Sequence, residues 1–157
     1  MSADKDSVKI KICIIISRFN KPVTDNLLEG ARAAFRNNEL DESCIDIYYV
    51  PGAFEIPVVL KKIARENIDR KKYDGILTIG CVIKGETAHF EYISESVTSG
   101  ISKISYEYEI PTGFCVLTCY DSRQAIERSL LPPDADNNKG YEAALSLLEL
   151  INLLKNI

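Results

Sequence analysis

The sequence predicts an α/β fold: a single-domain three-layer sandwich in which helices cover both faces of a four-stranded parallel sheet. Three observations predict it. Segments typical of strands alternate four times with amphipathic segments typical of helices. The strand segments are apolar almost throughout, as in sheets that are buried on both faces. The chain has 157 residues with neither repeats nor linkers, which is typical of one domain with a substantial core.

Two strands and two helices are expected in the first half of the chain. Residues 8–16 (VKIKICIII) alternate at first and then become continuously apolar, which is typical of a buried parallel strand. A helix opens at Pro22, because proline is favoured in a first turn and apolar residues then recur every three or four positions. Residues 45–50 (IDIYYV) form the second strand, which a Pro-Gly pair ends, and residues 54–67 form the second helix.

The second half repeats this pattern. Residues 75–83 (GILTIGCVI) are β-branched and apolar and predict the third strand. A long helix starts near Thr87, and its apolar residues recur at three- and four-residue steps along its whole length. Residues 112–118 (TGFCVLT) form the fourth strand, and a short helix over 122–129 and a last helix over 140–154 follow.

Composition and charge exclude several classes of protein. Nineteen basic and 23 acidic residues give a net charge of −4, whereas a general nucleic-acid binder carries a basic stripe. The longest apolar run, residues 12–16, is far too short to span a bilayer. Residues 1–8 (MSADKDSV) lack the basic start and apolar stretch of a signal peptide, and we expect them to be extended or disordered.

The five cysteines are expected to be buried free thiols of a cytoplasmic protein. Their number is odd, their spacing is irregular, and three of them lie inside predicted strands. Zinc sites show paired short spacings, often beside histidines, and this pattern is missing, so we expect no metal site. The cysteines are Cys13, Cys44, Cys81, Cys115 and Cys119.

Candidate ligand-binding residues follow the strands, because ligands bind at the carboxyl ends of the strands in such sheets. Phe19 comes after the first strand, where an aromatic ring can either stack on a planar ligand or fill the core. Residues 52–55 (GAFE) come after the second. Glu55 in a first turn is favoured by the helix dipole alone, and its alternative role is to hold a ligand hydroxyl or amide.

The third strand leads into the most informative segment, residues 80–92 (GCVIKGETAHFEY). A glycine-containing turn runs into a helix start at Thr87, whose backbone N–H groups suit a phosphate. His89 lies in that first turn and is the single histidine of the chain. Imidazole ordinarily titrates near neutral pH, so His89 is either an acid–base group or a structural residue.

Three residues near the fourth strand give less information about function when each is considered alone. Phe114 lies within an apolar run and is expected in the core. Arg128 is expected to be a solvated charge near a helix C-terminus. Lys139, at the start of the last helix, opposes the dipole preference and is therefore a candidate for a specific role.

Together these segments resemble the 6,7-dimethyl-8-ribityllumazine synthase family, which carries out the penultimate step of riboflavin biosynthesis. The resemblance runs from Lys9 to Leu154. Its most specific anchors are PGAFEIP at 51–57 and GCVIKGETAHFEYI at 80–93, whose order and spacing match the family. Shorter anchors are SRFN at 17–20, QAIER at 124–128 and NKG at 138–140.

The resemblance implies a flavodoxin-like fold and an enzyme that condenses 5-amino-6-(D-ribitylamino)uracil with 3,4-dihydroxy-2-butanone 4-phosphate. The products are 6,7-dimethyl-8-ribityllumazine, inorganic phosphate and two water molecules, and neither a metal nor a redox cofactor takes part. It also implies active sites formed between adjacent subunits of a homo-oligomer, with riboflavin synthase as a pathway partner.

The same resemblance implies a role for each matching residue. The residues that hold the pyrimidine and its ribityl chain are Phe19, Ala53, Phe54, Glu55, Cys81, Val82, Ile83 and, from the adjacent chain, Phe114. The phosphate is held by Glu86 and Thr87 through their N–H groups and by Arg128 of the adjacent chain. His89 is the acid and base, and Asn20 and Lys139 are further candidates.

One segment departs from the family. Residues 129–138 (SLLPPDADNN) are longer than the short Gly-rich link of the shell-forming members and contain two prolines, so we expect a homopentamer and no larger shell. Two alternatives to the enzyme remain: a flavodoxin-like module that holds a flavin or lumazine without catalysis, and a structural shell protein. The binding module would need neither His89 nor Arg128, and the shell protein would tolerate loss of both the phosphate-binding loop and His89.

Overall fold

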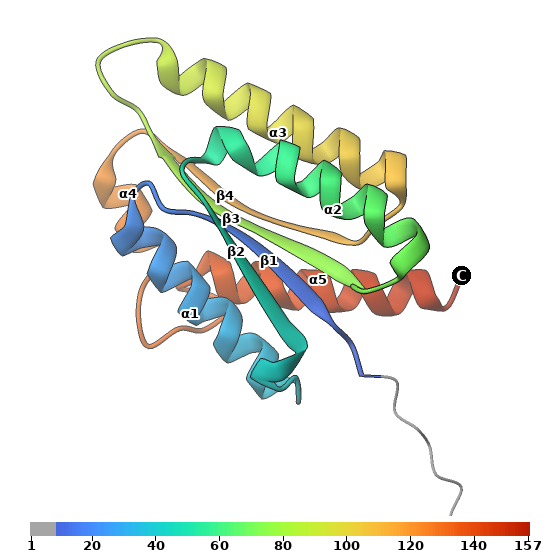
Figure 1. Ribbon diagram of the computed structural model, residues 1–157. Coiled ribbons are helices and arrows are strands. Elements are labelled where there is room, and N and C mark those ends of the chain that lie inside the picture. Colours follow the sequence, from blue (N-terminus) through green and yellow to red (C-terminus); the bar gives the residue numbers. More distant parts are fainter. Residues whose placement is uncertain (1–8) are drawn as a thin grey trace, which may run out of the picture.

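The computed structural model describes residues 9–157 (Figure 1). The extended or disordered state expected for residues 1–8, and the start of the first strand expected at residue 8, lie outside the described residues. None of the helices in residues 9–157 is long and apolar enough to cross a membrane.

A four-stranded parallel sheet forms the centre of the molecule, with strand order β2-β1-β3-β4. Its strands are β1 (Ile12–Ser17), β2 (Ile45–Val50), β3 (Gly75–Ile83) and β4 (Thr112–Cys119). Ile12 of β1 aligns with Ile45 on one side and with Gly75 on the other. The predicted fold class is thereby confirmed.

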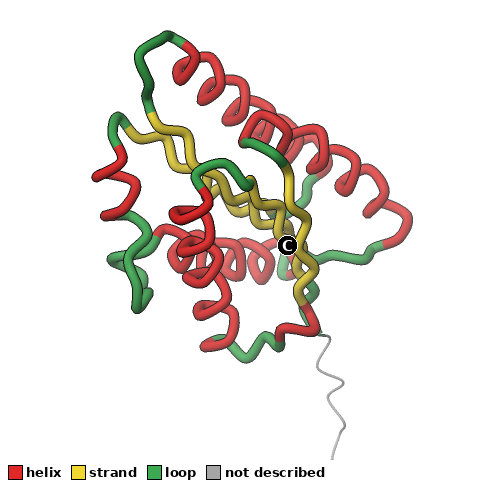
Figure 2. The backbone as a smooth tube through the Cα atoms, turned by 60° about the vertical axis from the view of Figure 1, so that its left-hand side comes forward, coloured by secondary structure: helices red, strands yellow, loops and turns green. Residues whose placement is uncertain are grey.

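Helices cover both faces of this sheet, as Figures 1 and 2 show. On one face lie α1 (Lys21–Asn37) and α5 (Lys139–Lys155), and on the other lie α2 (Ile56–Arg70) and α3 (His89–Tyr108). Each face has its own core of buried apolar side chains. The 3₁₀ turns η1 (Glu42–Cys44) and η2 (Ala53–Glu55) precede β2 and α2, and the short helix α4 (Ser122–Glu127) follows β4.

Several predicted boundaries were wrong by a few residues. The first strand begins at Ile12 and not at residue 8, at the same level as its two partner strands, which begin at Ile45 and Gly75. The second helix begins at Ile56, after the 3₁₀ turn η2. The short helix ends at Glu127, where the N–H of Arg128 bonds back to the carbonyl of Ala125.

The connection from α4 to α5 is anchored by Asn138, which is almost fully buried. Its side chain accepts from the N–H groups of Gly140 and Tyr141 and donates to the carbonyl of Asn26, 3.0 Å away in α1. A Cβ on Gly140 would lie 1.9 Å from the carbonyl oxygen of Leu27, so this close approach requires glycine. These contacts fix where α5 starts and therefore where Lys139 lies.

All five cysteines are free thiols, as expected. Four of them are buried, but Cys44 is partly exposed because it ends the surface turn η1. Burial raises the pKa of Cys13 and of Cys115 to about 12, so both thiols stay protonated at neutral pH.

Candidate functional site

The carboxyl ends of β1 and β3, together with the turn after β2, enclose a cavity of about 540 Å³. This is the edge at which ligands bind in doubly wound sheets. The residues that line it are Phe19, Gly52, Ala53, Phe54, Glu55, Cys81, Val82, Ile83, Gly85, Thr87, His89, Phe90 and Ile93. The structure thus brings together the candidate residues from three separate strand ends.

Phe19 lies at the mouth of this cavity, and its side chain is 70% exposed. Its backbone N–H donates to the carbonyl of Pro51 at 3.1 Å, which ties the loop after β1 to the turn after β2. The alternative that Phe19 fills the core is therefore wrong. An exposed ring fixed by its backbone can stack on a planar ligand.

Asn20 ties the same loop to the third strand. Its side-chain amide donates to the carbonyl oxygen of Cys81 at 2.8 Å. The backbone of Asn20 is left-handed, with a φ of 58°, a conformation that asparagine tolerates better than most residues. Because Asn20 does not line the cavity, it contributes by positioning Phe19 and the end of β3.

Glu55 is held in place by two hydrogen bonds to Gly52. One of its carboxylate oxygens accepts from the N–H of Gly52 at 3.0 Å, and the N–H of Glu55 donates back to the Gly52 carbonyl. Glu55 therefore satisfies a backbone N–H at the start of the helical segment, in line with the helix-start role considered for it. Because Glu55 also lines the cavity, its second carboxylate oxygen can accept from a ligand hydroxyl.

The end of β3 offers backbone groups to the cavity. The thiol of Cys81 packs into the core beneath α1 and α5, and burial raises its pKa to about 12, so the thiol is not a nucleophile. Val82 and Ile83 are half-buried and line the cavity. This strand end therefore offers a ligand backbone N–H and C=O groups and apolar surface.

The loop between β3 and α3 extends beyond the sheet at the upper left of Figure 1. It carries Gly85 and Thr87 on the cavity side, and Thr87 Oγ1 accepts from the N–H of His89 at 3.4 Å. The helix starts at His89, two residues later than predicted. The N–H of Glu91 donates to the Ala88 carbonyl, so the first turn leaves the N–H groups of His89 and Phe90 without helical partners, and these two groups favour an anion. Glu86 does not line the cavity, although both of its neighbours do.

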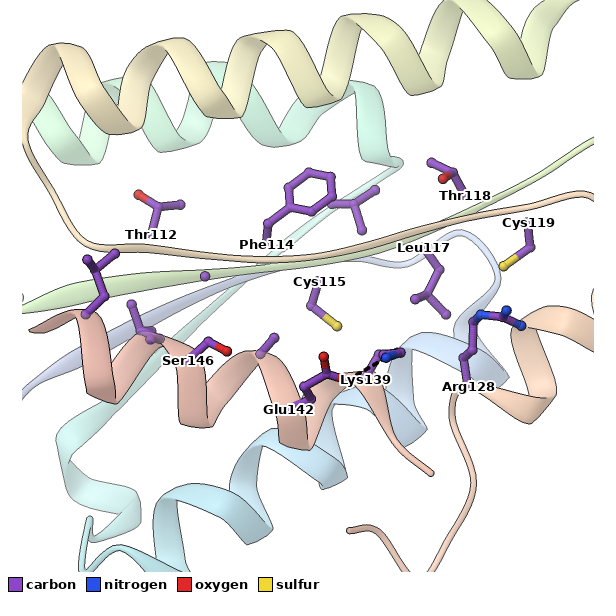
Figure 3. A pocket seen from close by; sticks show the side chains of 15 residues that line it. Thr112, Phe114, Cys115, Leu117, Thr118, Cys119, Arg128, Lys139, Glu142 and Ser146 are labelled. Carbon is purple, nitrogen blue, oxygen red and sulfur yellow. Dashed lines mark hydrogen bonds and ion pairs between the residues drawn. The ribbon is translucent and has the colours of Figure 1, made fainter. Parts of the chain in front are cut away.

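Phe114, Arg128 and Lys139 lie outside this cavity. They line a second hollow, of about 500 Å³, between the edge strand β4 and α5 (Figure 3). Phe114 is 45% exposed, so the prediction that it lies in the core was wrong. Figure 3 shows that Phe114 points to the face of β4 opposite Cys115, and within residues 9–157 β4 is an edge strand of the sheet.

Arg128 and Lys139 give this second hollow its cationic groups. Arg128 is exposed at the end of α4, as predicted, and its guanidinium donates to the carbonyl of Gln124 at 3.0 Å. The ammonium of Lys139 pairs with the carboxylate of Glu142 one turn along α5. Within residues 9–157, the cavity that holds His89 is lined by no lysine or arginine.

Sequence analysis missed two residues of the cavity lining. Phe90 and Ile93 belong to the apolar stripe predicted for the long helix, and both are half-buried and line the cavity. The signal was their position one and four residues after His89, at the start of α3, which projects beyond the sheet. In the described part of the chain, no group of three His, Cys, Asp or Glu side chains is placed to bind a metal.

The fold and the cavity define the class: a doubly wound, flavodoxin-like α/β protein with a small-molecule cavity at the carboxyl edge of its parallel sheet. Comparison with protein families identifies it further. The model of the family described as 6,7-dimethyl-8-ribityllumazine synthase matches residues 9–155. The chain belongs to this family. Membership assigns to it, in general terms, the lumazine synthase function of riboflavin biosynthesis.

Proposed function

We propose that this protein condenses 5-amino-6-(D-ribitylamino)uracil with 3,4-dihydroxy-2-butanone 4-phosphate to give 6,7-dimethyl-8-ribityllumazine. One observation carries the proposal: a single cavity joins an exposed aromatic ring, a carboxylate and the one histidine of the chain, in a member of the lumazine synthase family. Inorganic phosphate and two water molecules are the other products.

The pyrimidine substrate would bind across the mouth of the cavity. Phe19 stacks on the ring, since its backbone is fixed and its face is exposed. The backbone at Val82 and Ile83 meets the polar edge of the uracil. Glu55 accepts from the hydroxyl groups of the ribityl chain through the carboxylate oxygen that does not bond to the Gly52 N–H.

The chemistry consists of two C–N bond formations and the loss of three small molecules. The 5-amino group attacks the ketone carbon, and loss of water gives an imine. Removal of a proton from the adjacent carbon expels phosphate and leaves an enol, which takes a proton at its terminal carbon and loses the hydroxyl proton to become a second ketone. The ribitylamino nitrogen attacks this ketone with loss of the second water. These steps need a group that gives and takes protons, and His89 is the cavity's imidazole.

The phosphate would be bound by two copies of the chain. The N–H groups around Thr87 and the start of α3 provide donors on one copy. Because the lining of this cavity within residues 9–157 contains no lysine or arginine, we assign the opposing positive charge to Arg128 of a second copy, whose edge strand β4 also carries Phe114. A head-to-tail contact of this kind closes into a ring, and we propose a homopentamer.

A non-catalytic binding protein of the same fold is the main alternative. The discriminating experiment mixes the purified protein with both substrates and follows lumazine absorbance and fluorescence. The proposal predicts turnover of many product molecules per chain, and binding of the pyrimidine without product formation would support the alternative.

The free, protonated thiols fit a reducing compartment, and we propose a cytoplasmic location.

A further inference from the structure

The phosphate-binding loop, residues 84–89, is held chiefly at its two ends. At its start, the N–H of Lys84 donates to the carbonyl of Cys119 at 2.9 Å. At its end, the N–H of Glu91 donates to the carbonyl of Ala88 at 3.1 Å. Between these bonds the loop faces solvent, and a Cβ on Gly85 would meet no atom within 4 Å. A loop of this kind needs further contacts to keep one shape.

The ring of Tyr120, the first residue after β4, contacts both ends of this loop. The ammonium of Lys84 lies 5.9 Å from the centroid of the Tyr120 ring, within the range of a cation–π interaction. The Phe90 ring lies 6.1 Å from the same centroid at an interplanar angle of 47°, a favourable tilted arrangement. Lys84 precedes and Phe90 follows the cavity-lining residues of the loop, which are Gly85, Thr87 and His89, so the side chain of Tyr120 spans the loop.

Tyr120 is itself fixed from the opposite side. Its backbone N–H donates to Oε1 of Gln124 at 2.9 Å, and the N–H of Gln124 donates to the carboxylate of Asp121, the N-cap of α4. The backbone that carries the ring is therefore fixed at the junction of β4 and α4 by these two bonds. Tyr120 remains 70% exposed and does not line the cavity, so it touches the site through Phe90 and Lys84.

We propose that Tyr120 is a positioning residue that clamps the two ends of the phosphate-binding loop and thereby holds Thr87 and His89 in the cavity. The loop's role in phosphate binding rests on the proposed function, whereas the clamp itself rests on the contacts alone. Removal of the ring would leave the backbone bonds of Lys84 and Glu91 but increase how often they open. Binding of the phosphate-bearing substrate would weaken, and binding of the pyrimidine would not.

The first test measures amide hydrogen exchange on the full chain without ligand. In Tyr120→Ala we expect the Lys84 and Glu91 amides to exchange about 3- to 10-fold faster, since ring contacts of this kind are worth that factor. The Lys71 amide, bonded to the Asn67 carbonyl at the end of α2, is the internal reference and stays constant. Unchanged exchange at Lys84 and Glu91 would overturn the clamp.

Three further variants control this test. Tyr120→Phe keeps the ring and should retain wild-type protection, which separates the clamp from an effect of the hydroxyl. Tyr106→Ala removes an equally exposed tyrosine at the far end of α3 and should leave the loop amides unaffected. If Tyr120→Ala unfolds, Tyr120→Leu keeps apolar volume without a π face and takes its place. Slower exchange in Tyr120→Phe than in Tyr120→Ala supports the proposal, and equal rates contradict it.

The second test is kinetic. Tyr120→Ala should raise KM for the butanone phosphate about 3- to 10-fold while KM for the pyrimidine stays constant, and Tyr120→Phe should restore the wild-type value. An equal rise in both KM values would indicate general loosening and contradict the clamp. If even the wild-type protein forms no lumazine, the proposed function fails, while the exchange result still decides whether Tyr120 holds the loop.

Discussion

The side-chain amide of Asn20 donates a 2.8 Å hydrogen bond to the carbonyl of Cys81, 61 residues along the chain. This bond joins the loop after β1 to the end of β3, the two segments that carry Phe19 and the backbone of Val82. The aromatic ring and the strand end that we assign to one pyrimidine are therefore held at a fixed spacing. Asn20 also supplies the left-handed turn that opens α1.

Replacement of Asn20 should separate these two roles. Asn20→Gly keeps the left-handed turn and loses the bond, so we expect a loss of about 1 kcal/mol in the free energy of unfolding. Asn20→Asp keeps the side-chain size but points a carboxylate at a carbonyl oxygen, so it should cost more, roughly 1–3 kcal/mol. Urea denaturation measures both. Glu39→Gly, at another residue with left-handed backbone, is the control. Wild-type stability of Asn20→Asp would contradict a stabilising bond from the Asn20 side chain to the Cys81 carbonyl.

His89→Ala should leave the fold intact, because the side chain is exposed in the first turn of α3. We expect kcat to fall about 10²- to 10⁴-fold, the usual contribution of a general acid–base group. Some activity should remain, since positioning of two reactive substrates supplies much of the acceleration. Steady-state kinetics beside a Glu91→Ala control checks this, and an unchanged kcat would remove His89 from the mechanism.

Arg128→Ala should weaken binding of the butanone phosphate and spare binding of the pyrimidine. A guanidinium can donate two parallel bonds to phosphate oxygens, whereas the pyrimidine ring is assigned to Phe19. Calorimetric titration of each ligand measures the difference. Arg123→Ala, which removes another exposed arginine of α4, provides the matched control. Equal weakening of both ligands would show that Arg128 does not act on the phosphate.

Sites shared between subunits make a separate prediction. A mixture of Arg128→Ala and His89→Ala chains should regain activity after subunit exchange, because some sites then combine an intact His89 with an intact Arg128. The two parent variants measured alone are the controls. No recovery after verified exchange would place Arg128 outside the neighbouring site.

Asp46 and Tyr73 predict a pH dependence of stability. The Tyr73 hydroxyl donates to the Asp46 carboxylate at 2.6 Å, and this bond, followed by Lys11 and Lys72, lowers the pKa of Asp46 against the opposing effect of burial. A lowered pKa in the folded state stabilises the protein above the unfolded pKa of about 4, and this stability is lost as pH falls through the folded pKa.

Tyr73→Phe should therefore destabilise the protein by about 1 kcal/mol at neutral pH. The difference from the wild type should shrink as the pH falls from about 4 through the lowered folded pKa of Asp46, below which the carboxylate is protonated in both proteins. Urea denaturation at a series of pH values checks this. A difference that stays constant or grows towards low pH would show that the bond to ionised Asp46 is not its source.

Much of the fold could be predicted because residues next to the helices and strands mark where several of them begin or end. The bounds predicted for β2 and β3 are those of the structure. The Pro-Gly pair that starts at Pro51 marks the end of β2, and a glycine-containing turn marks the end of β3. The start of β1 could not be found in this way. It depends on where Ile45 and Gly75 offer partners, and this pairing is set by residues far along the chain.

The site was predictable to the extent that the strand-end rule applies. It brought Phe19, Glu55 and His89 to one edge, and the structure places all three in one cavity. Phe114 was misjudged because the order of strands makes β4 an edge, and no local pattern reveals that order. Tyr120 could not be predicted because its contacts with Lys84 and Phe90 join segments that are far apart in the sequence.

The size of the assembly is a further expected outcome. In the loop between α4 and α5, the Asp134 carboxylate accepts from the N–H groups of Asp136 and Asn137, so this loop is closed on itself. The prolines and the charged groups of Asp134 and Asp136 disfavour a second, shell-forming contact. Light scattering should find five chains of 17.6 kDa, about 88 kDa. A particle about twelve times heavier would contradict the pentamer.

The most direct test of the central claim counts two products in one reaction. Purified protein is given both substrates, and lumazine fluorescence and released inorganic phosphate are followed together against an enzyme-free control. Condensation predicts one phosphate per lumazine over many turnovers, with both rates falling together in His89→Ala. Lumazine formation no faster than in the control, with the pyrimidine nevertheless bound, would contradict the account.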